Sequence, residues 1–388
     1  MSCSPQIRGI GWDHPRCMSP LIGSVSDFNK IHPQLEIIWD TRSLYDFGEG
    51  NLKELLNDYD LIIFDHPYTG EISDNKWFVD LSASLSVEER SIFENDSLGS
   101  SWQSYQTETG IWGLPIDSAA QVASYRPDLM DRLKSPVPRS IAEVFKLAEK
   151  ARECNLWVAL PLAPCDAICT FMTLAANSGS AIARDGSSFP GYDECSHILR
   201  VLKELAGVCH PDSTKWNPIR CYDNMSANQD VCYVPFAFGY TNYSRNSPGS
   251  LIKYSNIPGM DSDSCSGAIL GGAGIGVSAK SKHPGISIEY AKMLCHPSYQ
   301  GSKYFRNNGQ PASLKAWRDE KNDKKINGFF SGTLATMEQA YLRPTLPDFL
   351  PFFRDSGKHI NAFLRGEISA DTTTQWLITN YSSPQSEP

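Results

Sequence analysis

The chain has 388 residues, of which 41% are hydrophobic and 20% are charged, an ordinary globular composition that excludes a disordered or low-complexity protein. A single hydrophobic core stops growing at roughly 250 to 300 residues, so this length predicts two domains. The net charge is −9 and no run of Lys and Arg stands out against it, which excludes nucleic acid as a partner.

The first 16 residues have neither the basic segment nor the apolar run of a secretory signal, and no apolar stretch is long enough to span a membrane. The cysteines number eleven and form no CxxC pairs, which favours free thiols in a reducing compartment over a disulfide framework. For the sequence as given we therefore expect a cytoplasmic protein. A periplasmic or extracellular location is the alternative if a leader has been removed.

The N-terminal segment has the pattern of a βαβ unit. Residues 7–12 form a short apolar run, typical of a strand. Apolar residues then recur at steps of three and four over residues 20–31, which predicts an amphipathic helix, and residues 35–39 return to a strand pattern.

Two predicted strands end in the same triplet, Asp-His-Pro. The triplet begins at Asp13 after the first strand, and at Asp65 after residues 61–64, a continuous apolar run typical of a strand buried on both faces. Open parallel sheets bind ligands at the carboxyl ends of their strands, so we expect both triplets at one ligand-binding edge. Three neighbouring side chains are expected to contact the ligand with them: Trp12, Arg16 and Tyr68.

Each triplet also has a structural interpretation. Asp13 would cap the helix that follows it, a role that suits an acidic residue at this position. His66 would merely be exposed in a solvated loop.

The middle of the chain predicts further α/β structure. The segment GIWGLPID, residues 110–117, precedes another apolar strand at residues 122–125. Ser140 is followed three residues later by Glu143, the spacing of a capping box, and apolar residues at helical spacing continue to about residue 152.

The order and spacing of these segments resemble the extracellular solute-binding proteins of ABC importers, in particular the maltose-binding-protein-like group with the periplasmic-binding-protein type II fold. The resemblance rests on four stretches, which are residues 110–129, 138–151, 271–284 with the helix at 288–294 and Pro297, and 310–312. It implies an α/β fold of two lobes, each a mostly parallel sheet flanked by helices, with crossing hinge segments that close around a ligand in the interlobe cleft.

The same resemblance implies the domain limits and further cleft residues. The N-terminal lobe would contain residues 1–118 plus 265–310, and the C-terminal lobe residues 119–264 plus 311–388. Ligand-binding side chains would include Asp117, Ser118, Gln121, Tyr240, Asn242, Tyr243 and Arg343.

Two of these assignments have alternatives, and Gly272 is a further candidate. The aromatic run that contains Tyr240 also fits a half-buried strand whose rings fill the core of the second lobe. Arg343 also fits a capping or surface salt-bridge role. Gly272 lies in a glycine-rich stretch, where the absence of side chains lets the backbone approach the ligand or the hinge.

We expect no metal and no cofactor. Two His and two Asp suit Zn²⁺ or Fe²⁺, but each His lies directly beside its Asp and a proline, which splays the side chains apart. The pattern at Gly274 and Gly276 superficially matches a dinucleotide-binding loop, yet it leads into a strand and not into the helix that phosphate binding requires.

Two functions remain open on the sequence alone. The first is reversible binding of a small polar or amphipathic organic molecule as a solute-binding protein, with an importer permease as partner only if the chain is exported. The second is a cytosolic, cofactor-independent lyase, isomerase or cyclase on the same scaffold. In that enzyme His14 or His66 would be the general base, and Asp13, Asp65 or Asp117 its partner or acid.

Overall fold

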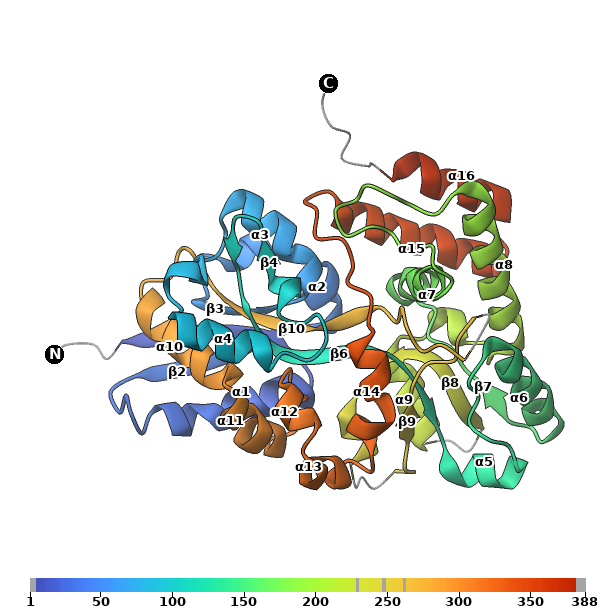
Figure 1. Ribbon diagram of the computed structural model, residues 1–388, viewed down its shortest axis with the longest axis horizontal. Coiled ribbons are helices and arrows are strands. Elements are labelled where there is room, and N and C mark those ends of the chain that lie inside the picture. Colours follow the sequence, from blue (N-terminus) through green and yellow to red (C-terminus); the bar gives the residue numbers. More distant parts are fainter. Residues whose placement is uncertain (1–4, 228–229, 246–248, 261–262, 382–388) are drawn as a thin grey trace. The chain divides into compact units, whose positions relative to one another are not determined.

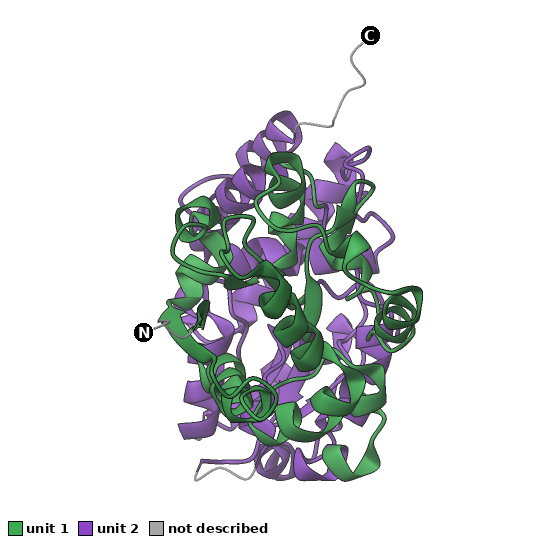
Figure 2. Cartoon of the chain, turned by 90° about the vertical axis from the view of Figure 1, so that its left-hand side faces the viewer, with its two compact units in different colours: residues 1–118, 271–322, 345–347 green, residues 119–270, 323–344, 348–388 purple. Residues whose placement is uncertain are grey.

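The computed structural model describes residues 5–227, 230–245, 249–260 and 263–381, and Figure 1 labels their helices and strands. Contacts divide the chain into two compact units, which Figure 2 colours separately. Unit 1 contains residues 1–118, 271–322 and 345–347, and unit 2 contains residues 119–270, 323–344 and 348–388.

Residues 265–270 belong to unit 2, although the prediction gave them to the N-terminal lobe. Within unit 2 the Leu270 amide donates to the Tyr341 carbonyl over 2.8 Å, and the Ile269 amide donates to the Thr173 hydroxyl over 3.0 Å. These hydrogen bonds join segments that are distant in the sequence, so no local sequence pattern predicts them.

Residues 311–322 and 345–347 belong to unit 1, although the prediction gave both to the C-terminal lobe. The Leu314 amide donates to the Asp96 carbonyl over 2.6 Å. The second segment packs so closely that a Cβ at Gly70 would lie 1.9 Å from the Thr345 carbonyl oxygen. Hydrophobic patterning cannot predict the position of so short a segment, because its contact depends on the missing side chain of Gly70.

A sheet forms the centre of unit 1, with the strand order β2-β1-β3-β10-β6. β1 pairs in parallel with β2 and β3, whereas β10 runs antiparallel to β3. All four residues of β3 are buried, as its continuous apolar run predicts. The strands are β1 (Gln6–Trp12), β2 (Glu36–Arg42), β3 (Leu61–Phe64), β6 (Leu114–Tyr125) and β10 (Leu270–Val277).

The helices of unit 1 include the one predicted over residues 20–31, which begins earlier, at Pro15, because His14 caps it. They are α1 (Pro15–Phe28), α2 (Leu44–Glu49), α3 (Thr69–Asn75), α4 (Val87–Asn95), α10 (Pro284–Cys295), α11 (Pro297–Tyr299) and α12 (Leu314–Trp317). A short hairpin pairs β4 (Gln106–Thr107) with β5 (Gly110–Ile111). α13 (Glu320–Lys325) contains the boundary between the units at residue 322.

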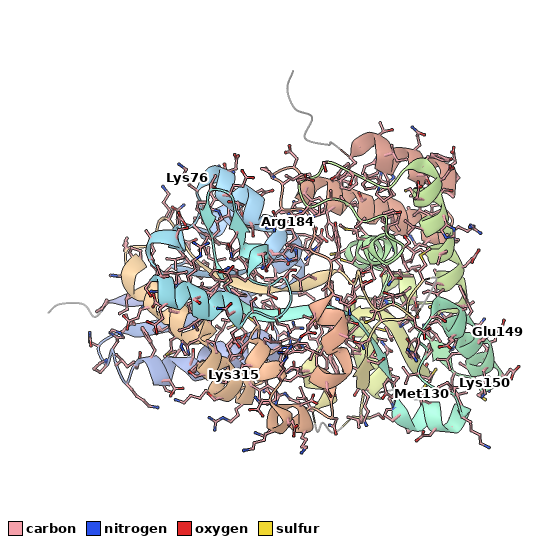
Figure 3. The ribbon with its side chains drawn as sticks, viewed as in Figure 1. Lys76, Met130, Glu149, Lys150, Arg184 and Lys315 are labelled. Atoms are coloured by element: carbon pink, nitrogen blue, oxygen red, sulfur yellow. The ribbon has the colours of Figure 1, made fainter. Side chains whose placement is uncertain are left out.

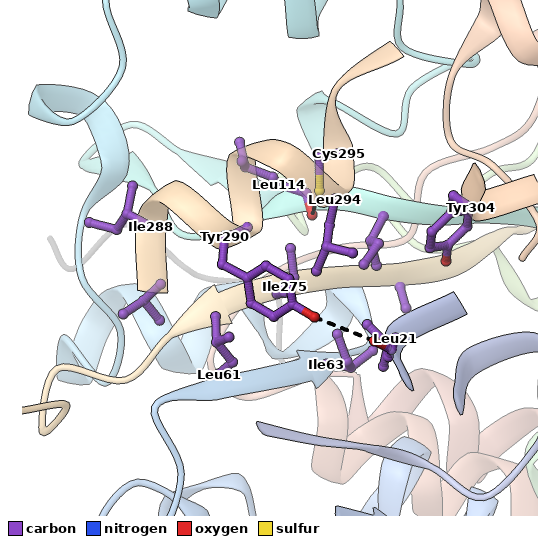
Figure 4. Packing of buried hydrophobic residues seen from close by; sticks show 14 of the residues in the cluster. Leu21, Leu61, Ile63, Leu114, Ile275, Ile288, Tyr290, Leu294, Cys295 and Tyr304 are labelled. Carbon is purple, nitrogen blue, oxygen red and sulfur yellow. Dashed lines mark hydrogen bonds between the residues drawn. The ribbon is translucent and has the colours of Figure 1, made fainter. Parts of the chain in front are cut away.

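A hydrophobic core fixes the sheet of unit 1 against its helices. Figure 4 shows Tyr290 of α10 among Leu61 and Ile63 of β3 and Ile275 of β10. The Tyr290 hydroxyl donates to the Leu21 carbonyl of α1 over 3.4 Å. Each fully buried aliphatic side chain contributes about 1.5–3 kcal/mol, so this packing holds the strand ends in fixed positions.

The sheet of unit 2 contains the second half of β6 together with β7 (Trp157–Val158), β8 (Val231–Phe238) and β9 (Lys253–Ser255). β6 pairs antiparallel with both β8 and β9, and β7 pairs in parallel with β8. This mixed sheet differs from the mostly parallel one expected for each lobe, because an apolar run does not show the direction of its neighbours.

The helices of unit 2 include α6, for which the predicted cap is confirmed: the Ser140 hydroxyl accepts from the Glu143 amide over 3.3 Å. They are α5 (Pro127–Leu133), α6 (Ile141–Glu153), α7 (Pro164–Asn177), α8 (Tyr192–Val208), α9 (Pro218–Ala227), α14 (Phe329–Glu338), α15 (Phe349–Arg365) and α16 (Ala370–Asn380).

Candidate functional site

The two Asp-His-Pro triplets lie at the same edge of the unit 1 sheet. β1 and β3 are parallel, and their register pairs Gly9 with Leu61. The same offset carried to the carboxyl ends of the strands places Asp13 level with Asp65. This carboxyl edge is where open α/β sheets bind their ligands.

In the first triplet the histidine caps the helix and leaves the aspartate exposed. His14 Nδ1 accepts from the Arg16 amide over 3.1 Å, at the start of α1. Burial, together with the charge of Arg16, lowers the pKa of His14 to about 4, so the ring is neutral at pH 7. The interpretation of Asp13 as the cap of this helix is therefore wrong: His14 is the cap, and Asp13 is exposed at the edge.

In the second triplet the aspartate caps and the histidine is buried. Asp65 accepts from the His66 amide over 2.8 Å, and its carboxylate lies 3.3 Å from His66 Nδ1. The His66 side chain is buried, so the interpretation as an exposed loop histidine is wrong. The Tyr68 ring is also buried, and its hydroxyl donates to the Gly50 carbonyl over 2.8 Å.

A buried ion pair connects the first triplet to β6. The Arg16 guanidinium donates to both oxygens of Asp117, with Nε to Oδ2 at 2.7 Å and Nη2 to Oδ1 at 2.5 Å. Both side chains are almost fully buried. Burial raises the pKa of Asp117, and the charge of Arg16 opposes that rise. Each charge neutralises the other, so the pair fixes α1 against β6 and offers little free charge to a ligand.

Trp12 and Arg42 are register partners at the same edge, and the sequence reasoning missed Arg42. Trp12 is buried with its ring 4.7 Å from that of Phe47, and the Arg42 guanidinium lies over the same Phe47 ring. Arg42 Nη2 also donates to the Ile63 carbonyl over 2.8 Å. Among the described residues, Trp12 Nε1 and Arg42 Nε have no hydrogen-bond partner. Arg42 ends β2, a position that the strand pattern alone could have singled out.

Gly272 allows β10 to approach β6. Its φ of +112° is unfavourable for other residues, and a Cβ there would lie 2.4 Å from the Asp117 carbonyl oxygen. The close backbone approach predicted at this glycine is thus made to β6.

Buried glutamines hold the chain on both sides of the unit boundary in β6. In unit 1, Gln310 Nε2 donates to the Ser118 carbonyl over 2.8 Å, and the Ser118 hydroxyl contacts that of Ser101. In unit 2, Gln121 Oε1 accepts from the Thr173 hydroxyl over 2.6 Å. Ser118 and Gln121 therefore have their polar groups occupied by their own units.

Gln300 is a further residue that the sequence reasoning missed. Its Nε2 donates to the Ile116 carbonyl over 2.8 Å, and its Oε1 accepts from the amides of Ala312 and Ser313 over 2.8 and 3.0 Å. It begins the π-helical turn Gln300–Tyr304. No motif or spacing marks this glutamine, because all its partners are distant in the sequence.

The predicted ligand-binding aromatics of unit 2 pack among themselves. Tyr240 is buried, its carbonyl accepts from the Tyr254 hydroxyl over 3.1 Å, and the Tyr243 hydroxyl donates to Asp223 over 2.7 Å. Burial favours the core-filling alternative for Tyr240, whereas Tyr243 is half-buried and its hydroxyl binds an exposed carboxylate. Asn242 lies between them and is half-buried.

The predicted ligand-binding arginine of unit 2 is also buried. The Arg343 guanidinium lies over the Phe353 ring, 5.5 Å from its centroid. Its proposed contact with a ligand stays a prediction.

Comparisons with known proteins give a match in structure alone. No family model and no curated protein matches the chain. A solute-binding protein from Agrobacterium radiobacter K84 in complex with ribitol superposes with a TM-score of 0.81 at 17% identity, over 97% of this chain and 98% of that one. Maltose-bound MalE3 from T. maritima gives a TM-score of 0.82 at 15% identity, also over 97% and 98% of the two chains.

A third structure of the same kind is an ABC transporter solute-binding protein from Thermotoga lettingae bound to α-D-tagatose. It has a TM-score of 0.82 at 14% identity, over 97% of this chain and 99% of that one. This chain has the periplasmic-binding-protein fold. The predicted α/β fold and the resemblance to ABC solute-binding proteins are thereby confirmed at the level of fold.

The chain passes from one unit to the other within β6 and again within β10, since each of these strands contains a unit boundary. Across the described residues, none of the helices combines the length and apolarity needed to cross a bilayer. Within the same residues, no three His, Cys, Asp or Glu side chains gather as a metal site would require.

Proposed function

We propose that this protein is a solute-binding protein that binds a small polar organic molecule at the carboxyl edge of unit 1. The observation that carries the proposal is the likeness in fold over 97% of the chain to proteins that bind ribitol, maltose and tagatose. That breadth of ligands within one fold favours a sugar or polyol as the ligand class.

The groups at the carboxyl edge suit a polyhydroxylated ligand. Asp13 is exposed and Asp65 is partly exposed, and carboxylate oxygens are strong acceptors for hydroxyl donors. Tyr45, in the first turn of α2 just beyond the end of β2, is 68% exposed. An exposed aromatic ring and exposed carboxylates supply the apolar surface and the acceptors that a sugar ring needs.

The enzyme alternative loses its support from the histidines. An effective general base has a pKa near the working pH, whereas the pKa of His14 is lowered to about 4 and its Nδ1 already accepts the Arg16 amide. His66 is buried, so it offers no accessible nitrogen to a substrate.

The cysteines do not conflict with a location outside the cytoplasmic membrane, where a permease would be the partner. Burial raises the pKa of Cys195 and Cys209 to about 12. Because the thiolate is the form that oxidises and exchanges disulfides, such buried thiols are chemically inert. The number of cysteines alone favours a reducing compartment, but most of the cysteines in the described residues are buried.

Titration calorimetry with ribitol, maltose and tagatose tests the proposal. Asp13→Asn removes the charge of the exposed carboxylate and should weaken binding of the best solute about tenfold, the usual effect of losing a hydrogen bond to a charged group. Asp58→Asn is the matched control, since Asp58 is also exposed but precedes β3 at the opposite edge of the sheet. Equal affinities for the two variants, or no binding by a wider panel of sugars and polyols, would overturn the proposal.

A further inference from the structure

Unit 1 contains a pocket with a volume of about 660 Å³ that includes no residue of either triplet. Its walls come from α3 and the residues after it, from the β4–β5 hairpin and from the segment 345–347. We propose that this pocket binds a small organic cation with a primary ammonium group, independently of the solute at the carboxyl edge.

Three hydroxyl groups form a closed triangle in one wall of the pocket. Ser73 Oγ lies 2.8 Å from Thr107 Oγ1 and 2.7 Å from Thr109 Oγ1, and the two threonine oxygens are 3.0 Å apart. Trp112 Nε1 donates to Thr107 Oγ1 over 2.9 Å. The Thr109 amide also donates to Thr107 Oγ1 over 3.3 Å, so the two acceptor sites of Thr107 are used and its own hydrogen points to Ser73 or Thr109. With the Thr107 hydrogen on Ser73 and the Ser73 hydrogen on Thr109, these two hydroxyls each keep one acceptor site. This wall can therefore accept hydrogen bonds from a ligand donor.

Asp80 supplies a carboxylate that is already held in place. Its Oδ1 accepts from the amides of Ser82 and Ile111 over 2.9 and 3.0 Å. Partial burial raises the pKa of Asp80, but these hydrogen bonds outweigh burial and the net shift is downward, so the group is ionised at pH 7. Gly110 leaves room for it, since a Cβ there would lie 2.8 Å from the carboxyl carbon.

The charges of the pocket favour a cation. Asp74 and Asp80 both line it, and Lys76, which follows α3 and is labelled in Figure 3, is the opposing charge in its lining. Two carboxylates against one ammonium leave a net charge of −1, which attracts a cationic ligand. Phe78 and Trp112 are buried with their rings in the lining and provide an apolar floor for a short alkyl chain.

Calorimetry with 1,4-diaminobutane as the probe tests the inference, with 1,4-butanediol as its uncharged counterpart. The diamine should bind the wild-type protein saturably and the diol at least tenfold more weakly. Asp80→Asn keeps the acceptor that the backbone amides need and removes the charge, so it should weaken diamine binding about tenfold. Lys76→Gln should act in the opposite direction and strengthen binding severalfold, because it removes a repelling charge.

Opposite signs for the Asp80 and Lys76 variants distinguish a ligand site from a purely structural role. Asp58→Asn is the control for a general change in surface charge and should leave diamine binding unchanged. An isotherm weakened by Asp13→Asn but not by Asp80→Asn would overturn the inference, because the diamine would then be a ligand of the carboxyl edge. Equal binding of the diamine and the diol would overturn it as well. Neither result bears on whether sugars or polyols bind at Asp13.

Discussion

The two Asp-His-Pro triplets have the same sequence and lie at the same edge of the same sheet, yet they use their side chains in opposite ways. In the first, His14 caps α1 and Asp13 is exposed. In the second, Asp65 caps the short 3₁₀ turn that precedes α3, and His66 is buried. Identical residues at equivalent positions thus present different groups to solvent.

The difference comes from where the next helix begins. α1 begins at the proline, so the residue before it, His14, occupies the capping position. The 3₁₀ turn begins one residue earlier, at His66, and the capping position falls to Asp65. Because a cap must accept from the first free amides of a helix, a shift of one residue decides which side chain remains available for a ligand.

The residues that follow the triplets differ as well. The third residue after each aspartate is Arg16 in one case and Tyr68 in the other. Arg16 makes a buried ion pair with Asp117, whereas the Tyr68 hydroxyl donates a neutral hydrogen bond to the Gly50 carbonyl. The same position is therefore held by a charged contact after β1 and by an uncharged one after β3.

The largest effect is expected when the charged contact is broken. Arg16→Met leaves the Asp117 carboxylate buried without its partner, which should lower the free energy of unfolding by about 3–5 kcal/mol. Urea denaturation measures this loss. The double variant Arg16→Met/Asp117→Leu removes both charges and should recover most of the stability. A cost below about 1 kcal/mol for the single variant would mean that the pair does not hold α1 to β6.

A smaller effect is expected from acid, acting on the first triplet through its cap. An unfolded histidine titrates near its ordinary pKa of about 6.5, whereas the pKa of folded His14 is about 4. Between these values the unfolded chain binds more protons, so stability is lost as the pH falls through this window. The loss from this one group is on the order of 2 kcal/mol by pH 4.5.

The variant His14→Asn isolates this contribution. Asparagine also caps helices but does not titrate, so the variant should lose less stability than the wild type between pH 7 and pH 4.5. The free energies of unfolding at the two pH values give the comparison. Equal losses in the two proteins would show that His14 is protonated as easily in the folded state as in the unfolded one.

The comparison also shows how far the sequence determines the site. Apolar runs predicted β1 and β3, and the rule for open parallel sheets predicted that Asp13 and Asp65 share an edge, as the register shows. Which residue of each triplet is the cap depends on a one-residue shift in helix start. Such a shift is smaller than hydrophobic periodicity can resolve.

Other parts of the site depend on contacts that have no local pattern. Arg16 and Asp117 are separated by 101 positions, and Gln300 and Ile116 by 184. The polar side chains of Arg16, Asp117 and Gln300 are also compatible with a surface position when each segment is considered alone. The position of Arg16 at a strand end and the resemblance that covers Asp117 predict that both contact the ligand, whereas the structure joins them to each other.

The smallest effect is expected at Tyr68, the neutral counterpart of Arg16. Tyr68→Phe keeps the buried ring and removes only the donor to the Gly50 carbonyl, so it should cost about 0.5–1.5 kcal/mol, the usual net value of one hydrogen bond. Urea denaturation beside Arg16→Met gives both costs on one scale. A cost for Tyr68→Phe equal to that of Arg16→Met would mean that burial of the side chain, and not the charge of its contact, determines how firmly each triplet is held.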